Sequence, residues 1–192
     1  MSSSYRLELD RWLAGLDVKA ETVLDVGGSQ LPIKGRTKSW DVEQYLIVDL
    51  PEPHVGSPKP DIAFNLELDT WRGNYAPADV VFCLEVMDYL IRPDRALMNI
   101  KYMLWDGGTA YVTWPFIYPT HQPLEAEGFR YTQRSIERLA ELSGLTIASM
   151  TPRRPETDLL DQFYRAERMR AAKRYDHHVT GWMTEFTREP GN

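Results

Sequence analysis

Residues 22–28 read Thr-Val-Leu-Asp-Val-Gly-Gly, an apolar run that ends on two glycines. A short apolar run of this kind is typical of a buried strand. The backbone can turn sharply at Gly27 and Gly28 because neither residue carries a Cβ atom. Similar runs follow at residues 45–49, Tyr-Leu-Ile-Val-Asp, and at residues 61–65, Asp-Ile-Ala-Phe-Asn. The sequence therefore predicts three buried strands, each ending on a small or polar residue.

The rest of the chain alternates between predicted strands and helices. The further predicted strands are 79–84, 109–114, 145–150 and 181–187, and the predicted helices are 5–16, 93–104, 133–143 and 156–175. The run at 79–84 is continuously apolar, as strands of parallel sheets covered on both faces tend to be. We expect Thr132 to cap the third helix and Gly144 to end it. This alternation predicts an open, doubly wound α/β sheet.

The composition fits one globular domain. The chain has 192 residues, of which 43% are hydrophobic and 26% charged, and this balance is ordinary for a folded protein. No internal repeat or flexible linker divides it. We expect one domain over 1–192, with an N-terminal helix (1–20), a ligand-binding core (21–151) and a C-terminal helix and last strand (152–192). The single cysteine, Cys83, excludes an intrachain disulfide and favours a cytoplasmic setting.

The charge balance argues against two classes of partner. The formal net charge is −6 at pH 7, so no overall positive field would attract nucleic acid or an anionic membrane. No apolar run approaches the ~20 residues that span a bilayer, and the N-terminus has no stretch of the signal-peptide kind. We expect neither nucleic acid nor a membrane as a partner, and the sequence gives no indication of the oligomeric state.

In a doubly wound sheet, ligands bind at the carboxyl ends of the strands, where the strand order reverses. This rule places the glycine pair, Asp49, Asn65 and residues 83–85 around one crevice. The glycines would let the backbone approach a ligand, and Asp49 would accept hydrogen bonds from both hydroxyls of a ribose. We therefore expect a nucleoside ligand. The alternative is that the glycines serve only the geometry of the turn.

The dinucleotide fingerprint, G-x-G-x-x-G, is a poor match because Ser29, Gln30 and Pro32 stand where it would need glycines. This disfavours a nicotinamide cofactor. A ligand without a pyrophosphate does not need a complete phosphate-binding turn, and the acidic first half of the chain suits a cation. S-adenosylmethionine combines a ribose, an adenine and a cationic sulfonium.

A family resemblance supports this ligand. Residues 23–28, Val-Leu-Asp-Val-Gly-Gly, resemble the first motif of class I S-adenosylmethionine-dependent methyltransferases, and residues 46–50, Leu-Ile-Val-Asp-Leu, resemble their acidic second motif. The segments 78–90, 93–97 and 104–112 are similar to the family's fourth strand, the helix after it and its fifth strand. The resemblance covers about residues 22–150, and its specificity lies in the order and spacing of these blocks.

The resemblance implies a doubly wound, mostly parallel seven-stranded sheet with an antiparallel last strand. It implies methyl transfer from S-adenosylmethionine to an oxygen or nitrogen of an acceptor by in-line displacement. The segment His121-Gln-Pro123 and residues 127–132 resemble members that frequently act on small molecules or sugars, which suggests a small-molecule or sugar-like acceptor. The alternative is a noncatalytic binding or interaction module with a decayed cofactor site, for which Ser29 and Leu31 in the glycine motif are the indication.

The resemblance also implies roles for single residues. Gly27 and Gly28 would lie against the methionine portion of the cofactor, and Asp25 would place its amino group directly or through water. Asp49 would hold the ribose. The other cofactor-binding residues implied are Leu50 beside the adenine, Asn65 and Leu66 at the adenine edge, and Cys83, Leu84 and Glu85 along the floor.

His121 is the candidate catalytic base, because a histidine on the loop after the fifth strand could titrate near neutrality and reach the methyl group. Alternatively, it only bonds the backbone or fixes the neighbouring loop. A base matters only where the acceptor carries a proton, since transfer from a sulfonium depends mainly on alignment and desolvation. We expect no metal site, because the neighbours His177 and His178 would point apart on a helix or strand, and no cysteine or carboxylate cluster has ligand spacing.

Overall fold

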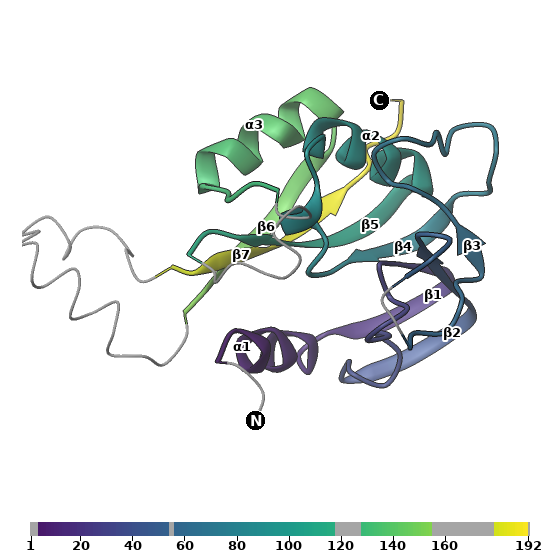
Figure 1. The fold of residues 1–192 in the computed structure, drawn as a ribbon, viewed down its shortest axis with the longest axis horizontal. Coiled ribbons are helices and arrows are strands. Elements are labelled where there is room, and N and C mark those ends of the chain that lie inside the picture. The colour runs from purple at the N-terminus through teal and green to yellow at the C-terminus, as the bar shows by residue number, and fades with distance from the viewer. Residues whose placement is uncertain (1–3, 54–55, 118–127, 155–178, 192) are drawn as a thin grey trace, which may run out of the picture.

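The computed structural model describes residues 4–53, 56–117, 128–154 and 179–191. Its elements in chain order are α1 (Ser4–Leu13), β1 (Asp17–Val26), β2 (Ser39–Asp49), β3 (Ile62–Ala63), β4 (Ala78–Cys83), the short 3-10 helix η1 (Met87–Tyr89), α2 (Pro93–Met103), β5 (Leu104–Pro115), α3 (Gln133–Ser143), β6 (Thr146–Arg153) and β7 (Gly181–Thr187). The strands form one seven-stranded sheet (Figure 1).

The strand order is β3-β2-β1-β4-β5-β7-β6. Strands β1 to β5 pair in parallel, whereas β7 runs antiparallel to both of its neighbours, β5 and β6. This confirms the prediction of a mostly parallel sheet with an antiparallel last strand. The order reverses between β1 and β4, because the chain winds outward to β3 and then returns to the other side of β1. The carboxyl ends of β1 and β4 therefore form the switch point at which such sheets bind ligands.

Helices lie on both faces of the sheet, with α2 and α3 on one side and α1 on the other (Figure 1). Leu97 and Ile100 of α2 and Ile136 of α3 belong to the larger buried cluster. Leu9 and Leu13 of α1 join a second cluster on the opposite face. Each such side chain contributes about 1.5–3 kcal/mol by leaving water. No helix in the described ranges is long and apolar enough to cross a membrane.

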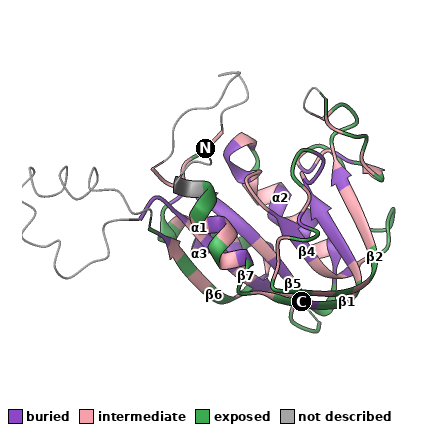
Figure 2. Cartoon of the chain, turned by 90° about the horizontal axis from the view of Figure 1, so that it is seen from below, coloured by how far each residue is buried: buried purple, intermediate pink, exposed green. Residues whose placement is uncertain are grey.

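Burial differs between the strands of the sheet, and β2, predicted as buried, has Val48 as its one buried residue. Figure 2 shows β4 largely buried and β6 largely exposed, as expected for an inner strand and an edge strand. The side chain of Trp114 in β5 is fully buried, whereas Trp105 at the start of the same strand is 53% exposed. Trp114 therefore packs in the core.

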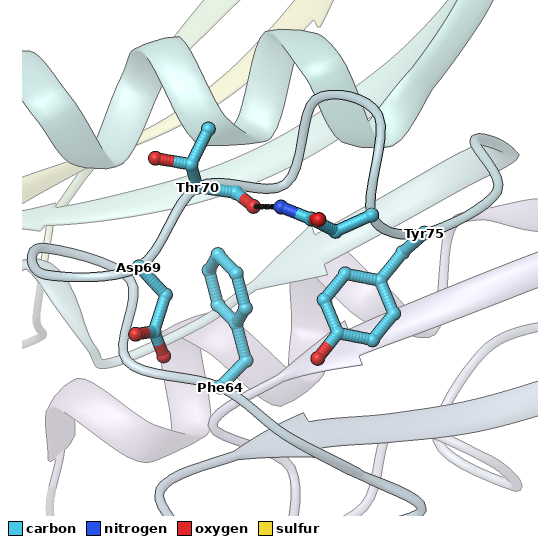
Figure 3. Close-up of a pocket in the computed structure, with 5 residues that line it drawn as sticks. Phe64, Asp69, Thr70 and Tyr75 are labelled. Carbon is cyan, nitrogen blue, oxygen red and sulfur yellow. Dashed lines mark hydrogen bonds between the residues drawn. The ribbon is translucent and has the colours of Figure 1, made fainter.

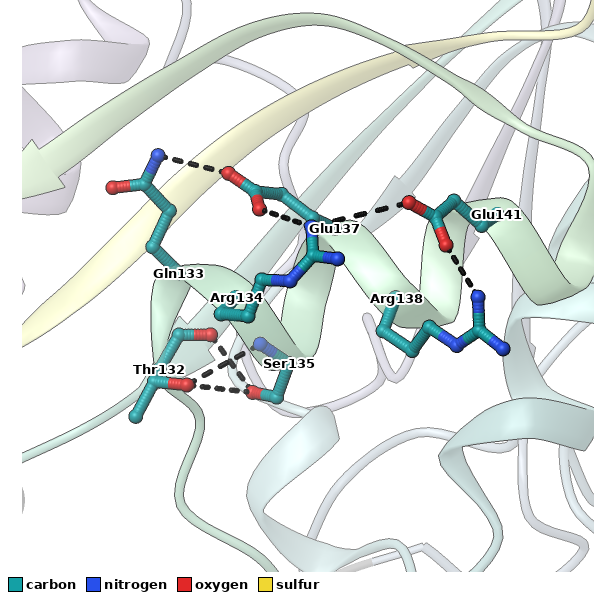
Figure 4. Close-up of polar contacts among 7 residues, drawn as sticks. All are labelled: Thr132, Gln133, Arg134, Ser135, Glu137, Arg138 and Glu141. Atoms are coloured by element: carbon teal, nitrogen blue, oxygen red, sulfur yellow. Dashed lines mark hydrogen bonds and ion pairs between the residues drawn. The ribbon is translucent and has the colours of Figure 1, made fainter.

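Helix α3 begins and ends as its sequence predicts. The hydroxyl of Thr132 accepts a hydrogen bond from the backbone N–H of Ser135 at 3.2 Å, and Gly144 ends the helix in the left-handed conformation, with φ 71°. Ion pairs between Arg134 and Glu137, and between Arg138 and Glu141, lie on its outer face (Figure 4). Such exposed pairs stabilise a fold by less than about 1 kcal/mol each.

Thr132→Ala is expected to lower the free energy of unfolding by about 1 kcal/mol, because it leaves a backbone N–H at the helix start without its cap. Urea unfolding of the variant measures the loss. Gln133→Ala is the control, since the described hydrogen bond of the Gln133 side chain goes to the carboxylate of the half-buried Glu137. Equal losses in the two variants would contradict a capping role for Thr132.

The strand boundaries differ from the prediction at several places. Strands β1 and β2 begin at Asp17 and Ser39, earlier than the apolar runs, because the polar residues before those runs continue the parallel pairing. The strand predicted at 61–65 shortens to Ile62–Ala63, since the chain turns at Asn65. Residues 27–38 join β1 to β2 without a helix. The helix predicted at 156–175 lies outside the described residues.

Candidate functional site

The turn after β1 depends on two glycines. Gly27 has φ 78°, a conformation that residues with side chains rarely adopt. A Cβ on Gly27 would lie 2.4 Å from Cγ2 of Val86, just beyond β4. A Cβ on Gly28 would lie 2.4 Å from the carboxyl group of Asp25. The absence of side chains therefore brings the turn close to both the end of β4 and the carboxylate beneath it.

Asp25 lies under this turn and is only 3% exposed. Its Oδ2 accepts hydrogen bonds from the backbone N–H of Ile33 at 2.8 Å and from the Tyr45 hydroxyl at 2.5 Å. Burial raises the pKa of Asp25 to about 6, although the hydrogen bonds from Tyr45 and Ile33 act in the opposite direction. Asp25 therefore ties the loop 27–33 to strands β1 and β2.

Asp25→Asn is expected to remove a pH dependence of stability. The pKa of about 6 lies above the ordinary value of 3.8, so the folded state binds this proton more tightly than the unfolded state does. The free energy of unfolding then falls as the pH rises from about 4 to about 6. The change is about 3 kcal/mol at about 1.4 kcal/mol per pH unit.

Asparagine keeps an oxygen for both donors but carries no charge. Urea unfolding at pH 4 and pH 7 should show the variant gaining about 3 kcal/mol relative to the original chain at the higher pH. An equal difference between the two proteins at both pH values would contradict the raised pKa.

Asp49 ends β2 beside the glycine turn. Its Oδ2 accepts a hydrogen bond from the backbone N–H of Ser29 at 3.2 Å, and its Oδ1 accepts one from the backbone N–H of Leu50 at 2.8 Å. A carboxylate can accept about four hydrogen bonds, so these two leave Asp49 able to accept more. The buried Ser29 hydroxyl has no hydrogen-bond partner among the described residues. Polar groups for a hydroxyl-bearing ligand therefore meet where β1 and β2 end.

Leu50, Asn65 and Leu66 differ in exposure. Leu50 follows Asp49 and is 46% exposed. The side-chain carbonyl of Asn65 accepts hydrogen bonds from the backbone N–H groups of residues 67 and 68, at 2.9 and 3.1 Å. Leu66 is 5% exposed and packs in the core. Asn65 therefore closes the turn after β3, and only Leu50 of the three presents an apolar surface to solvent.

Two cavities lie in the neighbouring loops. One, of about 390 Å³, lies in the loop after β3 and is shown in Figure 3; it is lined by Phe64, Asp69, Thr70, Asn74 and Tyr75. The other, of about 410 Å³, lies between α1 and the loop after β1 and is lined by Arg6, Asp10, Leu31 and Arg36. Neither is lined by Asp49 or by the residues that follow β4.

The end of β4 carries three of the predicted site residues. Cys83 is fully buried, and burial raises the pKa of its thiol far above the ordinary value. Leu84 is half-buried. Glu85 has φ 57° and is the one non-glycine residue in the described ranges with a positive φ. Of these three residues, Glu85 alone combines an ionisable side chain with access to solvent.

Glu85 is held by residues of two further strands. Its backbone N–H donates to the Thr113 hydroxyl at 2.7 Å, and that hydroxyl donates to Glu85 Oε1 at 2.8 Å. Arg153 Nη1 donates to the same Oε1 at 2.7 Å. Sequence reasoning missed both partners, and it also missed Tyr45 beneath the turn. No sequence signal links Arg153 to Glu85, because the two residues are 68 positions apart.

Several candidate residues lie outside the described part of the chain. His121, the candidate base, falls within 118–127, and His177 and His178 fall within 155–178. Among the described residues, no group of three or more His, Cys, Asp or Glu side chains is placed to hold a metal ion.

Comparisons with known proteins add evidence on the fold. No protein-family model matches the chain, and no curated protein matches it in sequence. An S-adenosylmethionine-dependent methyltransferase from Mesorhizobium loti is 12% identical over 96% of this chain and 98% of its own, with a TM-score of 0.59. One chain of the complex between the Haloferax volcanii methyltransferase activator Trm112 and its proposed methyltransferase partner is 16% identical over 98% and 90%, with a TM-score of 0.63.

A third similar structure is named for a different activity. The [4+2]-cyclase SpnF is 17% identical over 97% of this chain and 81% of its own, with a TM-score of 0.58. Likeness at these identities concerns the fold, and one fold can support different reactions. Together with the strand order, these matches show that the chain has the fold of the class I S-adenosylmethionine-dependent methyltransferases.

Proposed function

We propose that this protein is an S-adenosylmethionine-dependent methyltransferase that acts on an oxygen or nitrogen of a small-molecule or sugar-like acceptor. The observation that carries the proposal is the position of Asp49. Its partly exposed carboxylate stands at the end of β2, beside the switch point of the sheet and within hydrogen-bond distance of the turn formed by residues 27–29. This is where a ribose is bound in sheets of this topology.

The residues at this edge suit an adenosyl group. Asp49 would accept hydrogen bonds from the ribose hydroxyls, and the unpartnered Ser29 hydroxyl offers a further polar contact. Leu50 would cover one face of the adenine with its exposed side chain. A Cβ on Gly27 would strike Val86, so glycine at this position lets the turn lie directly against the residues that follow β4.

S-adenosylmethionine supplies a methyl group on a sulfonium, which is electrophilic without covalent help from the protein. The task of the protein is then to align the acceptor and to exclude water. The chain after the fifth strand returns to this edge: Tyr131 donates from its hydroxyl to the carbonyl of Met87 at 3.0 Å and from its backbone N–H to the carbonyl of Pro115 at 2.7 Å. The acceptor would bind on this side.

Calorimetric titration with S-adenosylmethionine and S-adenosylhomocysteine tests the proposal, with NAD as the control ligand. We expect saturable binding of both adenosyl ligands and none of NAD. A ligand at 100 times its dissociation constant should also raise the free energy of unfolding by about 2.7 kcal/mol. Transfer of a labelled methyl group to a panel of hydroxyl and amine compounds would then identify the acceptor.

A noncatalytic binding module is the second candidate function. The observations in its favour are that residues 27–38 join β1 to β2 without a helix, and that Ser29 and Leu31 stand in the glycine motif. This candidate predicts no binding of either adenosyl ligand at millimolar concentration, so the same titration separates it from the enzyme.

A further inference from the structure

The backbone of Glu85 is strained. Its φ of 57° is left-handed, and a residue with a side chain is less stable in that conformation by about 1–2 kcal/mol. Glycine would adopt the conformation freely. Strain of this kind persists where the surroundings fix it, and it is often found at functional sites. The strain at Glu85 therefore indicates that its side chain has a role that glycine could not fill.

That side chain is held by Arg153 and remains partly exposed. Arg153 is 2% exposed and places its Nη1 atom 2.7 Å from Oε1 of Glu85, whose side chain is 33% exposed. The second contact, from Nη2 to Oε2, is longer at 3.4 Å. The buried guanidinium therefore holds the carboxylate in a fixed orientation, while about a third of the Glu85 side chain stays exposed.

Glu85 and Asp49 lie on opposite sides of the end of β1. Asp49 ends β2 and Glu85 follows β4, and β1 lies between these strands. The two residues are thus separated by two strand spacings, about 10 Å. The Glu85 carboxylate turns toward Thr113 of β5 and Arg153 of β6, away from β2. With a ribose at Asp49, Glu85 would lie on the side from which an acceptor arrives.

We propose that Glu85 accepts a hydrogen bond from the N–H or O–H of the acceptor's reacting group, with Thr113 and Arg153 as positioning residues. This inference rests on the proposed function. The acceptor's lone pair forms the bond to the methyl carbon, and the pair of the breaking carbon–sulfur bond stays on sulfur. The acceptor's proton leaves along the hydrogen bond to Glu85 and passes to water.

This role defines a class of acceptor. A hydrogen bond to a carboxylate strengthens as positive charge develops on the attacking atom, so it favours the transition state over the bound acceptor. Primary and secondary amines and hydroxyl compounds can form that bond. Tertiary amines, pyridine-type nitrogens and thioethers cannot, because they carry no hydrogen on the attacking atom.

Binding alone can test the proposal, because sinefungin carries a protonated amine where S-adenosylmethionine carries the transferred methyl group. By calorimetry, the original chain should bind sinefungin at least about tenfold more tightly than S-adenosylhomocysteine, through a charge-assisted hydrogen bond to Glu85. Glu85→Gln should abolish the preference and change the affinity for S-adenosylhomocysteine by less than about twofold. Glu141→Gln, the same change on the outer face of α3, should keep the preference.

Each other outcome overturns the role of Glu85. Binding of S-adenosylhomocysteine with no sinefungin preference would contradict this inference alone, whereas no binding of either ligand would contradict the proposed function as well. An equal loss of both affinities in Glu85→Gln would make Glu85 a cofactor contact. If the glutamine variant fails to fold, Glu85→Asp keeps the charge but shortens the side chain, and it should lose most of the preference while still binding S-adenosylhomocysteine.

The positioning role of Arg153 has its own test. Arg153→Lys keeps a positive charge but loses the forked contact, so it should lower the sinefungin preference several-fold without changing the affinity for S-adenosylhomocysteine. Adding Arg153→Lys to Glu85→Gln should then have no further effect on the preference. A further decrease in the double variant would show that Arg153 does not act through Glu85.

Discussion

Asp49→Ala is expected to lower the affinity for S-adenosylhomocysteine about 100-fold or more. The substitution removes the carboxylate that would accept hydrogen bonds from two ribose hydroxyls. Hydrogen bonds to a charged group contribute about 1.5–3 kcal/mol each, and about 1.4 kcal/mol corresponds to tenfold in affinity. Calorimetric titration of the purified variant measures the loss.

Asp41→Ala is the matched control, because Asp41 lies on the same strand and its ion pair with Lys19, at 3.5 Å, is exposed. The control should bind with unchanged affinity. Asp49→Ala also leaves the backbone N–H groups of Ser29 and Leu50 without their acceptor, so its folding should be verified by thermal unfolding. Undiminished binding in a folded Asp49→Ala variant would contradict the ribose assignment.

The second large effect is expected from Gly28→Ala, which should lower the free energy of unfolding by about 3 kcal/mol. The new Cβ would lie 2.4 Å from the carboxyl group of Asp25. Asp25 cannot retreat without losing the hydrogen bonds from Ile33 and Tyr45. Overpacking costs about 1–3 kcal/mol, and each buried donor left unpaired costs about as much again.

Gly35→Ala is the control, since it lies in the same loop and a Cβ there would meet nothing within 4 Å. Its φ of 87° still disfavours alanine, so a cost of about 1 kcal/mol is expected. Chemical denaturation of the two variants measures both values. A Gly28→Ala variant as stable as Gly35→Ala would show that the loop can move away from Asp25.

The sequence predicts the elements of this fold well because its apolar runs are local features. The predicted runs at 22–26, 45–49 and 79–84 lie in or overlap β1, β2 and β4, although Val48 is the one buried residue of β2. The predicted cap at Thr132 is confirmed. Strand boundaries are predicted less well where polar residues extend a strand by pairing with the adjacent strand. The helix predicted at 93–104 ends at Met103, and the strand predicted at 109–114 begins earlier, at Leu104.

The site is predicted only in part, because its contacts join residues that are distant in sequence. The glycine turn and Asp49 lie at adjacent strand ends, as the topology rule predicts. The hydroxyl of Tyr45 reaches Asp25 across the β1–β2 pair, which depends on a strand register that composition does not reveal. Arg153 reaches Glu85 from β6, the edge strand that follows β5 and β7 in the sheet. Its predicted strand stopped at residue 150, short of the arginine.

A crystal structure of the protein with S-adenosylhomocysteine tests the central claim most directly. We predict both ribose hydroxyls within hydrogen-bond distance of the Asp49 carboxylate and the sulfur directed toward the end of β4, where Glu85 stands. A ligand seated instead in the cavity between Phe64 and Tyr75, or crystals that take up no ligand at millimolar concentration, would contradict a cofactor site at this edge of the sheet.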